Sequence, residues 1–238
     1  MNRTIHPIPL ATPDHPGSTR LWRTITALLA TIVALGALPS ALAQLGARPA
    51  EQWLKTLDSA NRLAGLKVDE VVAGLALKPG DVVADIGAGS GAFTFPLAAA
   101  VTSTGLVYAV DIEPGLIAHI AKKAREQQRT NIEAVLGKFT DPNLPARLVD
   151  VAFICDVLHH IEHRAEYLKN LARYLKPAGR VAVIDFYPEL GPHRNEKALQ
   201  ITKDETEAWM AAVGFKPVAE HKLYDNKWYV IYGRQVPD

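Results

Sequence analysis

The stretch VVADIGAGSG (residues 82–91) joins a short apolar run to a cluster of glycines. Val82–Ile86 predicts a buried β-strand, because β-branched residues dominate a short apolar segment. Gly87–Gly91 predicts a tight turn, and Ala92–Val101 is expected to form the helix that follows it. Glycines let the backbone approach a ligand closely, and a helix N-terminus presents free N–H groups to an anion. The stretch therefore predicts a ligand-binding turn at the end of a strand.

Strand and helix patterns alternate beyond this turn. Further strands are expected at Leu106–Val110, Asn131–Leu136, Val149–Cys155 and Arg180–Phe186, with helices at Gly115–Gln128 and Arg164–Leu175 and turns at Lys78–Asp81 and Lys176–Gly179. Such alternation predicts an α/β fold, in which right-handed crossovers build a parallel sheet with helices on both faces.

The segments before and after this strand–helix alternation do not follow it. Residues 50–76 are rich in helix formers and predict two short helices in front of the sheet. Thr202–Val213 predicts a helix capped by Thr202, since Glu205 follows three residues later. Two last strands, Lys216–Leu223 and Lys227–Tyr232, are expected to form a hairpin.

Composition excludes several classes of protein. The 238 residues include 26 Lys and Arg against 25 Asp and Glu, and one cysteine. A nearly neutral chain offers no argument for nucleic acid as a partner, which usually requires a basic face. One cysteine cannot form an internal disulfide, so the fold is not a cystine-stapled scaffold.

The first 43 residues are predicted to be a separate segment. Residues 1–19 contain four prolines and no apolar period, so we expect a disordered lead. Arg20 and Arg23 then precede an apolar run, Ile25–Leu38, and an A-x-A pattern that ends at Ala43. This layout is typical of a signal peptide, or of a membrane anchor if uncut, although the run is short of the ~20 residues of a comfortable span. We therefore expect an exported (periplasmic if bacterial) or membrane-anchored protein, associated with the membrane through residues 20–43, with its domain at 44–238.

Two acidic residues distinguish between nucleotide ligands for the glycine turn. Asp111 ends the next strand, where its carboxylate can accept hydrogen bonds from both hydroxyls of a ribose. Gly87, Gly89 and Ala92 also satisfy the G-x-G-x-x-G/A pattern of a dinucleotide site. However, a negative Asp85 beside the turn would repel a pyrophosphate and attract the ammonium group of S-adenosylmethionine. Charge complementarity therefore favours the cationic cofactor.

Four stretches resemble class I S-adenosylmethionine-dependent methyltransferases of the ubiquinone/menaquinone C-methyltransferase type. They are VVADIGAGSGAFTFPLA (82–98), VYAVDIEPG (107–115), VDVAFICDVLHHI (149–161) and LKPAGRVAVIDF (175–186). The resemblance implies a Rossmann-like, seven-stranded, mostly parallel sheet with a C-terminal antiparallel hairpin. It also implies S-adenosylmethionine as cofactor, and it is poorly specific for the methyl acceptor, which we expect to be a small molecule.

The resemblance assigns cofactor-binding residues by motif. The methionine portion is assigned to the acid and the glycine turn, the ribose to the end of the second strand, and the reactive end to the residue after the fourth strand. The family often has Gly-Asp after the third strand, whereas this chain has Gly-Lys-Phe, so Asp141 or the Phe139 backbone is expected to replace that contact with adenine. The expected cofactor-binding residues are Asp85, Gly87, Ala88, Gly89, Gly91, Asp111, Ile112, Lys138, Phe139 and Asp156.

A general base is needed only if the methyl acceptor must lose a proton. His160 is the first candidate and His159 the second, because histidine titrates near neutrality. Cys155, His159, His160 and His163 do not predict a metal site, since no second cluster of ligands is evident and zinc usually needs three or four. Cys155 is expected to be a small buried apolar residue instead.

Tyr187–Gln200 is expected to be a loop over the carboxyl edge of the sheet, where such sheets bind ligands. Substrate contacts are expected from Tyr187, His193, Arg194, Tyr224 and Trp228, with packing of the hairpin as the alternative for Trp228, and Trp53 and Arg62 are expected over the cofactor. Two other functions stay open: an NAD(P)-dependent oxidoreductase on a similar sheet, and a non-catalytic module that binds S-adenosylmethionine.

Overall fold

The computed structural model describes residues 49–145 and 148–234. The predicted lead and the signal or anchor segment, residues 1–43, lie outside the described residues. Among the helices of the described residues, none has both the length and the apolar character that crossing a membrane requires.

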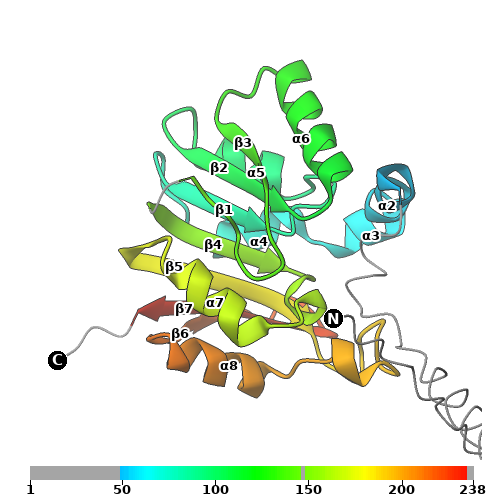
Figure 1. The fold of residues 1–238 in the computed structure, drawn as a ribbon, viewed down its shortest axis with the longest axis vertical. Coiled ribbons are helices and arrows are strands. Elements are labelled where there is room, and N and C mark those ends of the chain that lie inside the picture. Colours follow the sequence, from blue (N-terminus) through cyan, green and yellow to red (C-terminus); the bar gives the residue numbers. More distant parts are fainter. Residues whose placement is uncertain (1–48, 146–147, 235–238) are drawn as a thin grey trace, which may run out of the picture. The chain divides into compact units, whose positions relative to one another are not determined.

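One sheet organises the described part of the chain, with its seven strands in the order β3-β2-β1-β4-β5-β7-β6 (Figure 1). Strands β1 to β5 run parallel to one another, and β7 is antiparallel to both β5 and β6. The strands are β1 Val82–Ile86, β2 Leu106–Asp111, β3 Ile132–Leu136, β4 Val149–Cys155, β5 Leu175–Phe186, β6 Phe215–Glu220 and β7 Lys227–Arg234. The predicted Rossmann-like sheet with a C-terminal antiparallel hairpin is confirmed.

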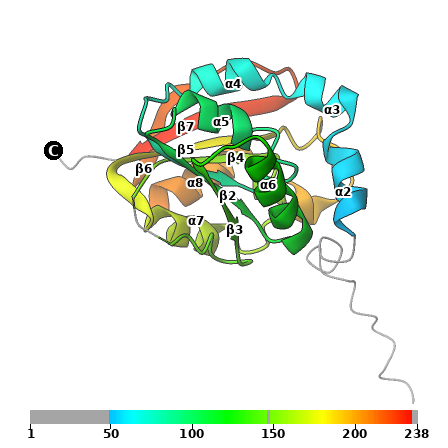
Figure 2. The ribbon, with the colours of Figure 1, turned by 90° about the horizontal axis from the view of Figure 1, so that it is seen from above.

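Helices cover both faces of this sheet (Figure 2). Helices α4 (Val68–Gly74), α5 (Thr94–Ala100) and α6 (Pro114–Glu126) pack on one face, and α7 (Arg164–Ala172) and α8 (Lys203–Ala212) pack on the other. Two short helices, α2 (Ala50–Leu57) and α3 (Ala60–Gly65), precede α4. Two 3₁₀ turns, η1 (Leu158–His160) and η2 (Lys197–Leu199), follow β4 and β5.

The central strands are buried on both sides, as a parallel sheet between two helical layers requires. In β4, Val151 and Phe153 belong to the core under α4 and α5, whereas Ala152 and Ile154 belong to the core under α7 and α8. This alternation explains why β4 is an unbroken apolar run from Val151 to Cys155.

The C-terminal elements follow the predicted local signals. The Thr202 hydroxyl accepts a hydrogen bond from the Glu205 backbone, and the Glu205 carboxylate accepts one from the Thr202 backbone, so the predicted cap of α8 is a complete capping box. The hairpin is also present, although β6 ends at Glu220 and the connection to β7 is longer than expected.

Three local expectations are wrong. Residues 50–74 form three helices, not two, and α5 begins at Thr94 because the glycine turn extends over the two residues before it. Lys176–Gly179 is not a turn between elements but lies inside β5. There the pairing with β4 shifts, so these residues interrupt the ladder without ending the strand.

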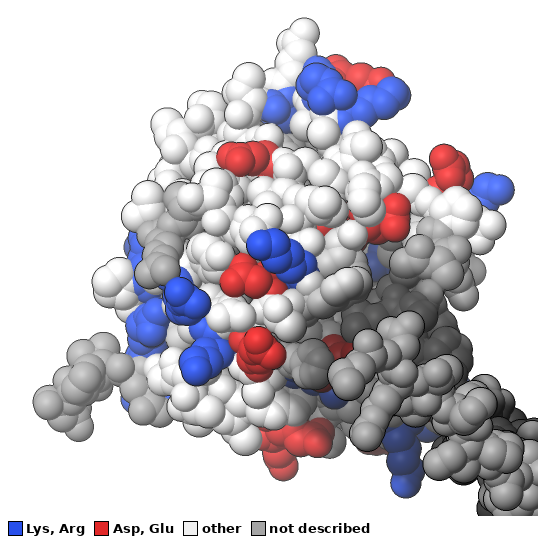
Figure 3. All heavy atoms as spheres, viewed as in Figure 1, with Lys and Arg blue, Asp and Glu red and all other residues white. Residues whose placement is uncertain are grey.

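The surface carries both signs of charge. On the face seen in Figure 3, Lys and Arg side chains lie among Asp and Glu side chains and a large uncharged area. This distribution agrees with the balanced charge of the chain.

Pairing of the central strands creates the functional edge. Strand β1 lies between β2 and β4, and all three run in the same direction. Their last residues, Ile86, Asp111 and Cys155, therefore lie at one edge of the sheet. Ligands of open α/β sheets bind at this carboxyl edge.

Candidate functional site

The glycine turn after β1 has the backbone that its sequence predicts. Gly87, Gly89 and Gly91 all have positive φ, at 70°, 58° and 81°. A Cβ added at Gly87 would approach Val157 Cγ2 to 2.3 Å, so the turn also packs closely against the segment after β4. The Val110 carbonyl accepts hydrogen bonds from the backbone N–H groups of both Gly87 and Ala88, which fixes the turn against β2.

Asp85 is a buried carboxyl group at the base of this turn. The residue is only 4% exposed. Its Oδ2 accepts a hydrogen bond of 2.6 Å from the Thr94 hydroxyl. Burial raises the pKa of Asp85 to about 7, which the Thr94 hydrogen bond partly offsets and the charge of Asp111 increases. Asp85 is therefore poised to be ionised by a cation that enters beside it.

Asp111 connects the end of β2 to the turn. Its Oδ2 accepts a hydrogen bond of 2.9 Å from the Gly89 backbone, and its Oδ1 accepts one of 3.0 Å from the Glu113 backbone. Burial raises the pKa of Asp111, and these hydrogen bonds act in the opposite direction. The carboxylate is thus held in a fixed orientation at the edge of the sheet.

A cavity of about 190 Å³ lies over this edge. All the predicted cofactor-binding residues line it except Gly91, whose place in the turn is structural. Trp53 of α2 and Arg62 of α3 line the cavity from the front helices, as predicted. Arg62 is oriented by a hydrogen bond of 3.0 Å from its Nη1 to the Leu57 carbonyl.

Asp141 does not take part in the cavity as the sequence suggested. Its Oδ1 accepts hydrogen bonds from the Tyr174 hydroxyl at 2.8 Å and from the Asn143 backbone at 2.6 Å. These bonds hold the carboxylate in the loop after β3. Lys138 and Phe139, however, line the cavity.

Asp156 adds a third carboxylate to the site. Its backbone has a φ of 58°, and its Oδ2 pairs with Lys227 Nζ at 2.7 Å, with the two side chains 13% and 8% exposed. The other oxygen, Oδ1, is buried without a hydrogen-bond partner among the described residues. Asp156 as a residue lines the cavity.

The two candidate bases lie in different surroundings. His160 lines the main cavity. His159 is buried beside it and pairs with Asp185, with 2.7 Å between Nδ1 and Oδ1. Burial, and then the neighbouring His159 and His193, lower the pKa of His160 to about 3. His160 therefore does not titrate near neutrality, which was the reason for predicting it as a general base.

Comparisons with known proteins agree with this geometry. Residues 84–183 match a family described as a methyltransferase domain. The aklanonic acid methyltransferase of a Streptomyces species is 34% identical over 118 residues, which cover 46% of this chain and 54% of that protein. The ubiquinone/menaquinone biosynthesis C-methyltransferase of Ectopseudomonas mendocina is 30% identical over 115 residues, with coverage of 46% and 43%. 

A structure of a S-adenosylmethionine-dependent methyltransferase from Aquifex aeolicus has a TM-score of 0.71 at 22% identity, covering 79% of this chain and all of that one. This likeness concerns the fold. The chain carries a class I S-adenosylmethionine-dependent methyltransferase domain. Its matched part spans about half the length of its first curated relatives.

The methyltransferase domain has site residues that sequence reasoning missed. Ser90 lies within the glycine turn, and its buried Oγ has no hydrogen-bond partner among the described residues. Tyr167 reaches the cavity from α7, far along the chain, and no local pattern marks it. Cys155 is buried, as predicted, and also lines the cavity, where burial raises the pKa of its thiol.

The expected substrate contacts are mostly outside the main cavity. Trp228 is 1% exposed and pairs with β5, so packing of the hairpin is its role. The Tyr224 hydroxyl donates to the Leu66 carbonyl, and Tyr187 packs on the core. Neither these residues nor Arg194 lines the main cavity, whereas His193 lies beside His159 and His160.

Replacement of Lys227 by methionine should destabilise the methyltransferase domain by about 3–5 kcal/mol, because the buried Asp156 then loses its counter-charge. Adding Asp156→Asn should recover part of this loss, since asparagine tolerates the positive φ. The free energy of unfolding in urea measures both effects. Lys122→Met, in the exposed pair with Glu126, is the control and should cost less than about 1 kcal/mol. Equal costs for the buried and exposed pairs would contradict this account.

Proposed function

We propose that this chain is a methyltransferase that transfers a methyl group from S-adenosylmethionine to a small molecule. One arrangement carries the proposal: the buried Asp85 and the fixed Asp111 lie on the two sides of one glycine turn and line one cavity. That arrangement matches a ligand with a cationic amino acid at one end and a nucleoside ribose at the other.

The residues present fit this cofactor. Asp85 is an acid whose ionised form lacks a counter-charge, and an ammonium group supplies one. Asp111 offers a carboxylate to a ribose, and the orphaned oxygens of Ser90 and Asp156 offer further polar contacts. A Cβ at Gly87 would clash with Val157, so the turn has no space for a larger residue.

When bound, the cofactor supplies an activated methyl group on a positively charged sulfur. The task of the chain is then mainly to orient the acceptor in line and to exclude water, and proximity alone can give a large rate increase. Phe139, Val157 and Ile161 give the wall of the cavity an apolar character suited to both tasks. With the pKa of His160 far below neutrality, no proton transfer is assigned to it.

The proposed acceptor is a small organic molecule. The names of the related proteins point in this direction, because they include a methyltransferase of aklanonic acid and a methyltransferase of 2-phytyl-1,4-naphthoquinone. Ring systems of that kind suit a cavity with aromatic and aliphatic walls.

Two other functions are less well supported. An NAD(P)-dependent oxidoreductase would place a diphosphate beside Asp85, and the matched family is a methyltransferase domain. The other alternative is a non-catalytic module that binds S-adenosylmethionine. One structure with this fold, at 16% identity and a TM-score of 0.61, is that of a [4+2]-cyclase, so the fold is not confined to methyltransferases. Binding of the cofactor without turnover on any acceptor would favour that alternative.

Export or membrane anchoring through residues 20–43 stays part of the proposal. The positive flank, the apolar run and the A-x-A pattern support it. Amino-terminal sequencing of the natural protein tests it: a start at Gln44 would show cleavage, and an uncut chain recovered in the soluble fraction would contradict both forms. Because S-adenosylmethionine is made in the cytosol, a cleaved and exported form would also need a supply of cofactor.

Calorimetric titration of the full chain tests the cofactor assignment directly. We expect binding of S-adenosylmethionine and of its demethylated product, and no binding of NAD. Asp111→Ala should weaken the affinity by about 10- to 100-fold, because hydrogen bonds to a charged group contribute about 1.5–3 kcal/mol. Asp225→Ala, in the connection between β6 and β7, is the matched control and should bind normally. Unchanged affinity in Asp111→Ala would refute the ribose assignment, and binding of NAD alone would refute the proposed function.

The affinity for S-adenosylmethionine should also depend on pH through Asp85. The pKa of this carboxyl is about 7 without ligand, and a bound ammonium group favours the ionised form. As the pH falls below 7, a proton therefore competes with the cofactor, and affinity should decrease by up to about tenfold per pH unit. Titrations from pH 7.5 to 5.5 measure this, with Asp85→Asn as the reference that cancels the ligand's own ionisation. A constant ratio between the two proteins would contradict the role of Asp85.

A further inference from the structure

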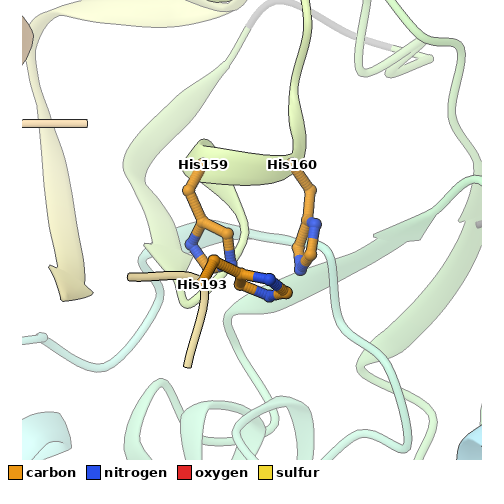
Figure 4. Close-up of side chains that lie close together, drawn as sticks. All are labelled: His159, His160 and His193. Atoms are coloured by element: carbon orange, nitrogen blue, oxygen red, sulfur yellow. The ribbon is translucent and has the colours of Figure 1, made fainter. Parts of the chain in front are cut away.

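Three histidines converge beside the cofactor cavity. His159 and His160 lie on η1 after β4, and His193 comes from the loop after β5 (Figure 4). One ring nitrogen of each lies within 4.8 Å of a ring nitrogen of the other two. The sequence argument against a metal relied on the lack of further ligands near His159 and His160, and His193 supplies one.

Carboxylates orient two of the three rings. His159 Nδ1 lies 2.7 Å from Asp185 Oδ1, and Asp185 is 1% exposed and also accepts a hydrogen bond from the His159 backbone. His193 Nδ1 lies 2.9 Å from Glu196 Oε1. An imidazole that donates from Nδ1 to a carboxylate carries its lone pair on Nε2. Metal-binding histidines are characteristically oriented in this way.

The rings do not form a simple stack. Their planes are inclined by 46°, 45° and 80°, with centroids 4.1, 5.3 and 5.2 Å apart. A cation bound where one nitrogen of each ring comes within 4.8 Å of the others could take a lone pair from all three imidazoles.

We propose that His159, His160 and His193 bind a divalent first-row transition metal ion, with zinc as the best match. Three imidazole ligands suit zinc and its neighbours in the series, whereas magnesium and calcium prefer oxygen ligands. Zinc sites with three protein ligands keep a fourth position for water or substrate. The proposed site is thus of the open type.

The location of this metal site suggests which molecule binds at the open fourth coordination position of the ion. His160 lines the cofactor cavity, and His159 and His193 line a smaller neighbouring cavity that also contains Asp185 and Phe186. If the proposed methyl transfer is correct, on which this step rests, the ion lies on the side of the methyl acceptor. A hydroxyl or thiol of the acceptor bound there would lose its proton more easily.

Titration of the full chain with Co²⁺ in the absence of cofactor tests the metal site. Co²⁺ replaces zinc in such sites, and its visible absorption reports a four-coordinate environment. We expect a visible band that saturates at one equivalent and disappears in His193→Ala, a change in a partly exposed loop residue. His163→Ala is the matched control, because His163 is close in sequence and outside the cluster, and it should keep the band. The absence of a band in the unmodified chain, or its survival in His193→Ala, would overturn the proposal.

Two further measurements separate the site from a chance association of histidines. Glu196→Gln should lower the Co²⁺ affinity by about 10- to 100-fold, as loss of an orienting carboxylate does at metal sites. Azide should shift the visible band by taking the open fourth position, and an unchanged band would contradict an open site. None of these measurements involves S-adenosylmethionine, so failure of the metal site and failure of the proposed function are distinguishable.

Discussion

The site depends on one buried carboxyl group, Asp85, which the fold places beside a turn whose three glycines have positive φ. A carboxylate removed from water is costly unless a partner compensates its charge. Among the described residues, the side chain that hydrogen-bonds to Asp85 is the neutral hydroxyl of Thr94. The raised pKa expresses that cost. A cation that enters the cavity offsets this cost of ionising Asp85, so the site favours a positively charged ligand. This preference follows from the charge of the carboxylate alone, without reference to any related protein.

The order of the parallel strands places the other residues of the site beside Asp85. Because β1 lies between β2 and β4, the acid at the end of β2 and the acid after β4 are brought to the same edge as the glycine turn. Residues separated by about 70 positions, such as Asp156 and Lys227, meet there in a buried pair. The antiparallel β7 is needed for this pair, since it begins at this edge, with Lys227 opposite Phe186 at the end of β5. The hairpin thus stabilises the site in addition to closing the sheet.

The sequence predicted features that are set by neighbouring residues. It mostly missed contacts between residues that are far apart along the chain. Strand runs, the capping box of Thr202 and the glycine turn are written in neighbouring residues, and all of them are present in the structure. Asp141 was misplaced because its partner, Tyr174, lies more than thirty residues away. The residues Lys176–Gly179 have the composition of a turn, but pairing of their neighbours with β4 keeps them within one strand. The role of His193 was invisible for the same reason, as only the folded chain shows that the loop after β5 returns to η1.

These observations divide the site into two halves with different constraints. The half built on β1 and β2 contains the glycine turn and Asp111, and short motifs in neighbouring residues suffice to describe it. The half built on the ends of β4 and β5 is where we propose that the methyl acceptor binds, and the related proteins are named for different acceptors. Its chemistry is set by loops, and here the loop after β5 brings an imidazole to two others. A fold of this kind can therefore keep its cofactor and change its acceptor chemistry by altering one loop, and the histidine cluster lies where such a change would act.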